Sequence, residues 1–272
     1  MVYPEATSGQ QRISAAFVRA LQQQSAAFMP YFTLGYPDRE TSLRVVEAIA
    51  PFSDLIELGV PFSDPLADGP TVQRSTQRSL AQGTTTADCL QMVRELRARG
   101  VKVPFLLMGY YNPILAYGEA GYVHDAAEAG ADGFIVPDLP LEEAQPLDSL
   151  AKVAGMVLIH MLAPTSQGHR LRNVAQVARG FIYLVSLTGV TGARSELAVG
   201  LADFVSTVRQ AASVPLAVGF GIGTPRQAAE VAALADGVIV GSALVDAVDR
   251  APGNEVAAAV AFVKSVQDAL KK

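Results

Sequence analysis

Residues 128–136 read EAGADGFIV, and residues 233–240 read ALADGVIV. In each stretch a helical pattern of small residues ends at Gly or at Ala-Asp-Gly, and a short apolar run follows at once. Continuous apolar runs of this length are typical of parallel strands that are buried on both faces. The two stretches therefore predict helix-to-strand junctions of one kind far apart in the chain, although no repeat of fixed period connects them.

The same alternation extends along the whole chain. Strands are predicted for eight short apolar runs, at residues 26–33, 53–58, 103–108, 132–137, 156–161, 181–186, 215–220 and 237–240. Helices are predicted for longer amphipathic or Ala-rich segments, at residues 39–50, 84–98, 119–129, 141–153, 170–178, 200–212, 225–234 and 255–270. Eight strand–helix units in 272 residues favour a closed (β/α)8 barrel, a fold that often takes about 250 residues.

We therefore expect residues 1–272 to form a single TIM-barrel domain of the α/β class. An extra helix is expected at the N-terminus, and short helices are expected in the loops that follow the strands. A doubly wound open sheet is the alternative arrangement of the same elements.

Composition narrows the classes of protein further. Half of the residues are hydrophobic and 17% are charged, so the chain can bury a large core and is not intrinsically disordered. The net charge is −5 and no basic run occurs, which argues against a nucleic-acid partner. Cys89 is the only cysteine, which excludes an intramolecular disulfide and argues strongly against a thiolate zinc site. The three histidines show no metal-ligand spacing, so we predict no metal site.

Neither a signal peptide nor a membrane span is predicted. The N-terminus lacks a basic segment followed by an apolar one, and the longest uncharged stretch, at 103–118, is interrupted by prolines and glycines. We expect a soluble, cytoplasmic protein.

A long loop follows the second predicted strand, with the sequence ELGVPFSDPLADGP at residues 57–70. In (β/α)8 barrels the chemistry lies at the C-terminal ends of the strands. Glu57 ends this strand, where burial raises the pKa of a carboxyl group and suits it to proton transfer. A structural salt bridge is an equally good reading of this glutamate. Asp64 and Asp68 fit turn or cap positions singly, but a long loop with two carboxylates above an acid indicates a functional site.

Three later strand ends are rich in glycine. The sequence SLTGVTGAR at 186–194 is small and polar, and it predicts a mobile lid or a plain turn. The sequences GFGIGTP at 219–225 and VGSALV at 240–245 lead into helix starts, where free N–H groups favour a phosphate. Tight turns are the plain alternative. The residues alone thus predict a barrel for a phosphorylated small molecule, with carboxylate acid–base chemistry.

These motifs occur together in a characteristic order. They are PYFTLGYPD (30–38), ELGVPFSDPLADGP (57–70), LMGYYNPIL (107–115), PDLPLEE (137–143), SLTGVTGAR (186–194), GFGI (219–222) and VGSA (240–243). With them the chain closely resembles the tryptophan synthase alpha chain family over nearly its whole length. The motifs at 57–70 and 186–194 are long and specific to that family.

The resemblance implies a reaction, a fold and a partner. The reaction is the retro-aldol cleavage of indole-3-glycerol phosphate to indole and D-glyceraldehyde 3-phosphate, carried out in a (β/α)8 barrel that has no cofactor of its own. The partner is a beta chain that holds pyridoxal phosphate, receives indole through an internal tunnel and condenses it with serine. An α2β2 heterotetramer is expected.

The resemblance also assigns roles to residues. Glu57 matches the family's catalytic glutamate, and Asp68 matches the aspartate that hydrogen-bonds the indole N–H. Substrate-binding positions are matched by Tyr31, Tyr110, Tyr183, Thr191, Gly192, Phe220, Gly221, Gly241 and Ser242. Among these, Tyr183 is expected beside the glutamate and Thr191 in the lid, while Gly192, Gly221, Gly241 and Ser242 are expected at the phosphate.

Three further residues complete the expected indole pocket: Met108, Ile135 and Met161. Packing in the barrel core is the alternative reading of these side chains. The chain departs from many relatives at Tyr31, where Phe is common, and at Met108, where Leu is common, which concerns the shape of the pocket and not the reaction. Pro61 and Asp64 match positions that carry signals to the beta chain.

Other functions stay open at this point. A stand-alone lyase that releases free indole would carry the same residues. A non-catalytic barrel that serves as a binding or regulatory subunit is a second possibility, against which the presence of both Glu57 and Asp68 speaks. An unrelated phosphate-binding barrel, such as a flavin-dependent one, is a third.

Overall fold

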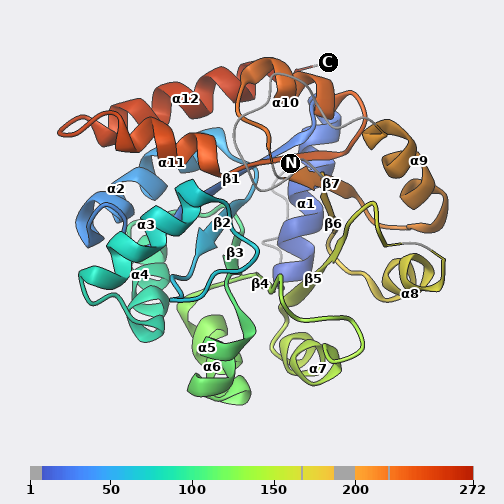
Figure 1. The fold of residues 1–272 in the computed structure, drawn as a ribbon, viewed down its shortest axis with the longest axis horizontal. Helices are drawn as coiled ribbons and strands as arrows, with labels where there is room; N and C mark the ends of the chain where they lie inside the picture. Colours follow the sequence, from blue (N-terminus) through green and yellow to red (C-terminus); the bar gives the residue numbers. More distant parts are fainter. Residues whose placement is uncertain (1–7, 167, 187–199, 220, 272) are drawn as a thin grey trace.

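The computed structural model describes residues 8–166, 168–186, 200–219 and 221–271. Within these residues eight parallel strands close into a barrel in the order of the sequence, and helices surround it (Figure 1). The strands are β1 (Ala27–Thr33), β2 (Ile56–Gly59), β3 (Phe105–Met108), β4 (Gly133–Ile135), β5 (Val157–Leu162), β6 (Ile182–Val185), β7 (Leu216–Gly219) and β8 (Gly237–Val240).

Closure of the barrel decides between the two expected arrangements. Strand β1 pairs with β2 on one side and with β8 on the other, so no sheet edge is left. The predicted (β/α)8 barrel is confirmed, and the open sheet is excluded. Each strand lies within three residues of its predicted bounds.

The helices follow the predicted alternation. They are α1 (Gly9–Gln22), α2 (Arg39–Ile49), the 3-10 turn η1 (Ala50–Phe52), α3 (Pro70–Ala81), α4 (Thr86–Ala98), α5 (Tyr111–Tyr117), α6 (Glu119–Ala129), α7 (Gln145–Val153), α8 (His169–Val177), α9 (Leu201–Ala211), α10 (Pro225–Ala232), α11 (Ser242–Asp249) and α12 (Glu255–Ala269). Helix α7 begins four residues later than predicted, since Pro146 in its first turn has no N–H to continue a helix from 141.

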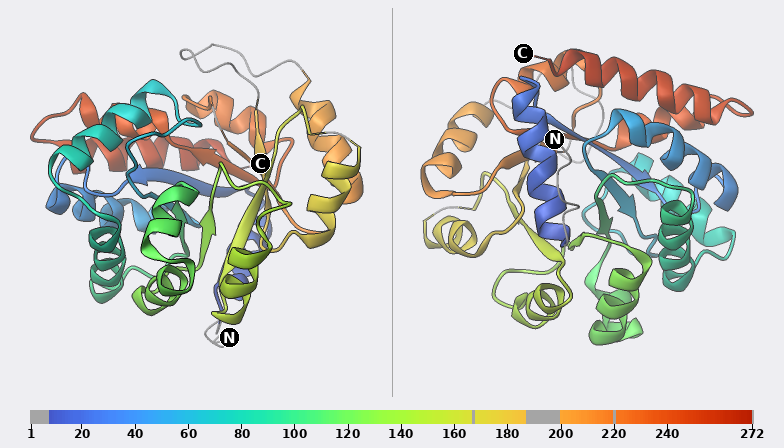
Figure 2. Two further views of the ribbon diagram at one scale, coloured as in Figure 1. Left: turned by 60° about the horizontal axis from the view of Figure 1, so that its bottom comes forward. Right: turned by 180° about the vertical axis from the view of Figure 1, so that it is seen from behind.

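Helix α1 closes the N-terminal end of the barrel. It lies across the end that faces away in Figure 1 and is seen in front in the right-hand view of Figure 2. Ile13 and Phe17 of this helix are buried, and the Phe17 ring lies 5.5 Å from the ring of Phe181 at the start of β6. Helix α1 thus covers the N-terminal end of the barrel (Figure 2). We propose that residues 1–272 form one domain.

The junction motifs have a common structural role. Asp132, before β4, accepts the backbone N–H of Phe105 at 2.8 Å, and Asp236, before β8, accepts that of Leu216 at 2.8 Å. Asp54, before β2, accepts the N–H of Phe28 in the same way at 2.8 Å. Each aspartate thus bonds to the first residues of the preceding strand. The carboxylate satisfies an N–H that would otherwise be unpaired, and it fixes the register of two neighbouring strands.

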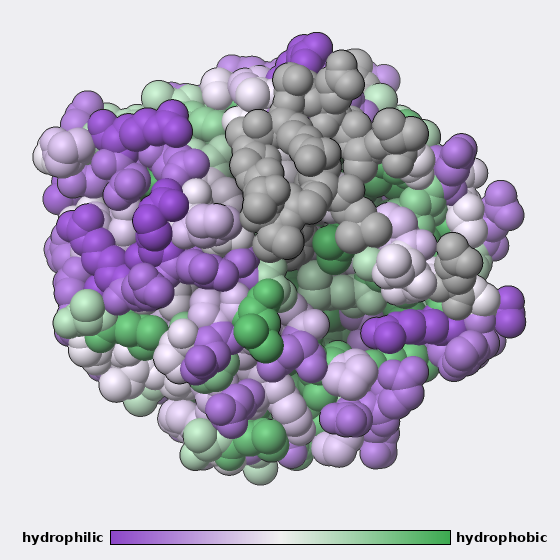
Figure 3. Space-filling view, viewed as in Figure 1, coloured by the Kyte–Doolittle hydropathy of each residue, from purple (hydrophilic) through white to green (hydrophobic). Residues whose placement is uncertain are grey.

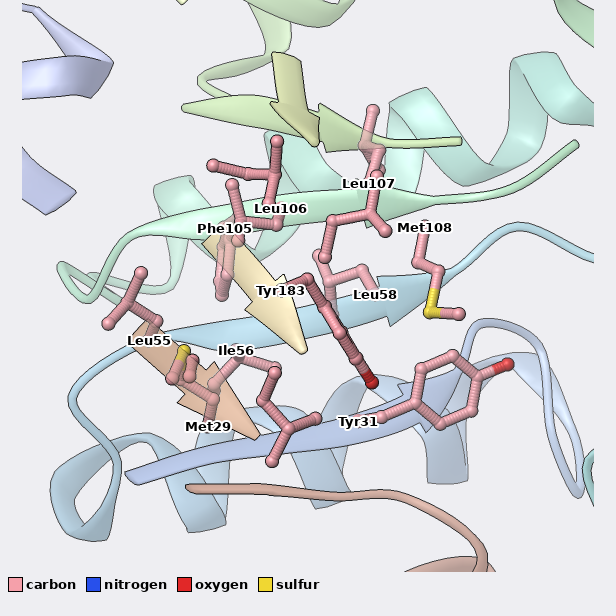
Figure 4. Close-up of a cluster of buried hydrophobic side chains, with 14 of the residues drawn as sticks. Met29, Tyr31, Leu55, Ile56, Leu58, Phe105, Leu106, Leu107, Met108 and Tyr183 are labelled. Carbon is pink, nitrogen blue, oxygen red and sulfur yellow. The ribbon is translucent and has the colours of Figure 1, made fainter. Parts of the chain in front are cut away.

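Apolar side chains fill the barrel below its C-terminal end. Met29, Ile56 and Phe105 belong to this core, with Tyr31 and Tyr183 nearer the C-terminal ends of their strands (Figure 4). Among the helices that the structure describes, none is long and apolar enough to cross a membrane.

Candidate active site

Glu57 is the second of the four residues of β2, and its side chain is enclosed. Only 1% of the residue is exposed, and neither carboxylate oxygen has a hydrogen-bond partner among the described residues. Burial raises the pKa of Glu57 to about 8. At neutral pH the carboxyl group is therefore mostly protonated. The structure contradicts the salt-bridge alternative for this residue, because no cation is paired with it in the described part of the chain.

Two phenols lie near this acid. Tyr31 is the β1 partner of Glu57 in the strand register. Burial is the main cause of the raised pKa values of Tyr31 and Tyr183, and the charge of an ionised Glu57 raises both further. Figure 4 shows the two rings pointing into the same part of the barrel. Two glycines make room for them. A Cβ on Gly59 would lie 2.1 Å from the Tyr31 hydroxyl, and one on Gly219 would lie 2.2 Å from that of Tyr183.

Asp68 comes from the β2–α3 loop and is also buried, with 9% of the residue exposed. Burial raises its pKa to about 6, and a hydrogen bond from the Tyr110 hydroxyl partly opposes that shift. The Tyr110 oxygen also accepts the N–H of Ala67 at 2.9 Å, and its ring lies 5.5 Å from that of Phe62. The tyrosine therefore holds the loop against the end of β3. At neutral pH Asp68 is mostly ionised.

A small cavity joins several of these groups. It has a volume of about 10 Å³, which holds no more than one water molecule. Its lining residues are Tyr31, Val60, Phe62, Asp68, Thr76, Met108, Gly109, Tyr110 and Pro137. The structure thus brings together Asp68 with Tyr31, Met108 and Tyr110, all predicted at the site. Side chains or loops must move before a ring system enters.

The other predicted wall residues lie elsewhere. Ile135 is fully buried in β4 and is the register partner of Met108, but it does not line this cavity. Met161 is the register partner of Tyr183 in β5 and lines a different cavity on that side of the barrel. Thr191, Gly192 and Phe220 lie outside the described residues.

The glycine-rich segments after β7 and β8 lead into helices whose first turns are capped differently. The N-terminus of α10 is capped internally, since Thr224 and Gln227 form a capping box and Gln227 also accepts the N–H of Gly223 at 2.9 Å. Helix α11 begins at Ser242 after Gly241, and its first turn has no side-chain cap within the described residues. Unpaired N–H groups attract an anion. The α11 start is therefore the better phosphate position, and Gly221, with a positive φ of 77°, lies in the neighbouring loop.

Some residues of the site were not predicted from the sequence. The Tyr31 hydroxyl lies 3.2 Å from the Thr33 hydroxyl, which in turn lies 2.7 Å from that of Ser75 in α3. Phe62 supports Tyr110. The position of Thr33 two residues after Tyr31, on the same face of β1, was a signal that could have been used. Contacts to α3 and Phe62 depend on tertiary packing alone.

Of the two residues predicted at the interface with the beta chain, one is exposed and the other is buried. Asp64 is exposed and accepts a hydrogen bond from Ser63, and the neighbouring Leu66 is 89% exposed. Pro61 is buried. The tip of the β2–α3 loop, which also carries Asp68, thus presents a carboxylate and a large apolar side chain to the exterior.

Comparisons with known proteins agree with one another. The sequence model of the family described as tryptophan synthase alpha chain matches residues 17–272. The chain is 52% identical to the tryptophan synthase alpha chain of Chloroflexus aggregans over 96% of this chain and 98% of that one. It is 47% identical to that of Geobacter sulfurreducens over 95% and 98%.

Solved structures give the same result. The crystal structure of the tryptophan synthase alpha chain from Legionella pneumophila superposes with a TM-score of 0.88 at 34% identity, covering 97% of this chain and 98% of that one. A structure of Mycobacterium tuberculosis tryptophan synthase superposes with a TM-score of 0.88 at 35% identity, covering 96% and 98%.

Proposed function

The chain belongs to the tryptophan synthase alpha chain family, and we propose that Glu57 and Asp68 carry the chemistry of the alpha reaction in it. The protein is a carbon–carbon lyase of tryptophan biosynthesis that cleaves indole-3-glycerol phosphate to indole and D-glyceraldehyde 3-phosphate. What supports the assignment of the two residues is their pair of pKa values, about 8 for Glu57 and about 6 for Asp68.

The two pKa values give Glu57 and Asp68 different protonation states at neutral pH. Between pH 6 and 8 Glu57 is mostly a neutral acid that can donate a proton, and Asp68 is mostly a carboxylate that can accept a hydrogen bond. Both shifts have the same main cause, burial, but Asp68 has a hydrogen bond from Tyr110 that lowers its value and Glu57 has no such bond. Two acids with separated pKa values are typical of acid–base catalysis.

The reaction needs two proton transfers at neighbouring carbons. Glu57 donates its proton to C3 of the indole ring, and the ring nitrogen gains positive charge. Asp68 accepts the hydrogen bond of the indole N–H and stabilises that charge. The bond from C3 to the glycerol carbon then breaks, and its electron pair restores the aromatic ring. The hydroxyl proton of that glycerol carbon passes to Glu57 as the aldehyde forms, so the acid ends protonated as it began.

The surrounding residues position the substrate. The rings of Tyr31 and Tyr110 and the Met108 side chain form apolar walls suited to a flat indole ring. We propose that the phosphate binds at the start of α11, at Gly241 and Ser242, together with Gly221, Gly192 and the lid residue Thr191. Phe220 and Tyr183 are proposed as further contacts to the indole and to the glycerol part.

The family implies a beta-chain partner. We propose an α2β2 heterotetramer in which pyridoxal phosphate is bound only by the beta chain. The exposed Asp64 and Leu66 at the tip of the β2–α3 loop support a contact at this place, since the same loop carries Asp68. Binding of the partner would then reposition Asp68 directly. We further propose that the enzyme acts in the cytoplasm, where its charged substrate is retained.

One experiment tests the proposed function. Indole release from indole-3-glycerol phosphate is followed with the full chain alone and after addition of a tryptophan synthase beta chain. Slow release alone and a large increase with the beta chain are expected. Fast release alone would indicate a stand-alone lyase, and no indole under either condition would overturn the proposal. The chain has no tryptophan, so indole fluorescence in the assay comes from ligand or product.

A further inference from the structure

A second, larger cavity lies beside the small one and shares Pro137 with it, but neither Glu57 nor Asp68 is among its lining residues. It has a volume of about 320 Å³ and is enclosed by the β4–α7 loop, strand β5 and helix α8. Leu139, Leu141, Leu158 and Val174 provide apolar walls. Figure 3 shows apolar surface recessed between hydrophilic patches on this side, where α7 and α8 lie in Figure 1. The volume falls in the range of small-molecule sites.

A buried histidine lines this cavity. His160 follows Ile159 and precedes Met161 in β5, so it points to the opposite, outer face of the strand. It is 7% exposed and makes no hydrogen bond within the described residues, although polar side chains this deeply buried are normally bonded. Burial lowers its pKa, with Asp148 raising it and Arg179 lowering it as smaller effects. The neutral imidazole therefore offers the cavity one donor and one acceptor.

The rim of the cavity carries both signs of charge. Asp138 from the β4–α7 loop and Arg170 from α8 line it, and both are exposed. Asp138 accepts the N–H of Tyr111 at 3.0 Å, which leaves further acceptor sites on its carboxylate. No ion pair joins Asp138 to Arg170, or either of them to another charged group, in the part of the chain that the structure describes. A cation and an anion are thus held at one opening without neutralising each other.

We propose that this cavity binds a free α-amino acid whose aromatic side chain carries an O–H or N–H group. The ammonium group pairs with Asp138 and the carboxylate with Arg170, while the ring lies between the leucines. The polar group of the ring hydrogen-bonds His160. This ligand satisfies all three polar groups at once, which neither a plain carboxylic acid nor an amine does.

Calorimetric titration of the full chain tests the proposal with L-tyrosine as the probe. Saturable one-to-one binding is expected. L-phenylalanine lacks the hydroxyl, tyramine lacks the carboxylate and 3-(4-hydroxyphenyl)propionate lacks the ammonium group. Each of these three probes is expected to bind at least about tenfold more weakly than L-tyrosine, because each loses one polar contact. Absence of saturable L-tyrosine binding, or equal affinities for all four probes, would overturn the proposal.

Three variants assign the contacts. His160→Phe keeps a ring of similar size and should reduce L-tyrosine affinity to that of L-phenylalanine. Arg170→Ala should weaken the binding of L-tyrosine and of the propionate about tenfold and leave that of tyramine unchanged. Asp138→Asn should weaken the binding of L-tyrosine and of tyramine about tenfold and leave that of the propionate unchanged. An unchanged L-tyrosine affinity in all three variants would place the ligand elsewhere and refute the site. Indole release by His160→Phe should equal that of the parent chain, because His160 is not part of the proposed lyase machinery.

Discussion

Two carboxylates are buried to the same degree at different levels of the barrel, and only one is paired. Asp132 is 0% exposed; it forms ion pairs with Arg12 and with Arg97, the latter at 2.9 Å, and accepts the N–H of Phe105. Glu57 is 1% exposed and has no hydrogen-bond partner among the described residues. The first lies at the end that α1 closes, and the second faces the substrate end.

The difference shows how burial serves two purposes in one barrel. A buried charge is costly unless it is paired, so Asp132 with its partners joins α1, α4 and two strands into one unit. Glu57 avoids the cost by taking up a proton, and that proton is what the reaction uses. Asp132 is therefore expected to serve stability, and Glu57 is expected to serve turnover.

The largest expected effect is that of Glu57→Gln on turnover. The amide keeps the shape of the side chain but cannot donate and regain a proton, so indole release with the beta chain should fall by about 10²- to 10⁴-fold. The unfolding midpoint at pH 8 should not decrease, because no partner is lost. Turnover within threefold of the parent would refute the role of Glu57.

Asp132→Asn should lower the stability of the fold and leave turnover nearly unchanged. Breaking a buried ion pair costs about 3–5 kcal/mol of unfolding free energy, which urea denaturation measures. Turnover below the unfolding range should change little, since Asp132 lies at the closed end. Asp236→Asn is the matched control: its carboxylate has the same junction role but is 39% exposed, so its loss of stability should be clearly smaller. Equal losses would contradict the argument from burial.

The unpaired acid also predicts how stability depends on pH. The pKa of Glu57 is raised from 4.5 to about 8 by folding, so between these values the folded state binds more protons than the unfolded state. Stability from this group is fully present below pH 4.5 and is lost as pH rises through about 8. Urea midpoints of the parent and of Glu57→Gln, measured from pH 5 to pH 9, should converge at low pH and separate at high pH in favour of the variant. Parallel curves would contradict the raised pKa.

The smallest effect is expected for Tyr110→Phe. The variant loses the hydrogen bonds to Asp68 and to the N–H of Ala67, at about 0.5–1.5 kcal/mol each. Because the Tyr110 bond lowers the pKa of Asp68, the acidic limb of the kcat/KM profile should move above its expected position near pH 6. The alkaline limb near pH 8, from Glu57, should stay in place. A shift of both limbs would mean that the two acids titrate as a coupled pair.

Much of the fold could be predicted from local patterns. Apolar runs and amphipathic segments located all eight strands, because strand and helix periodicity act over a few residues. The start of α7 was predicted four residues too early, because the helical pattern was extended back to 141 without use of Pro146, a residue favoured in the first turn of a helix. The cavity beside the outward-facing His160 was not predicted, because it forms only where the β4–α7 loop and helix α8 pack around β5.

The sequence by itself determined the eight strand–helix units, the family and the residues Glu57 and Asp68 as candidates, since these depend on residue type, order and spacing. Only the tertiary structure decided that Glu57 is unpaired, that Tyr110 holds Asp68, and that Asp132 meets two arginines. The reason is physical. The state of a buried carboxyl group depends on which charges and donors surround it in space, and closing the barrel brings those groups together from distant parts of the chain.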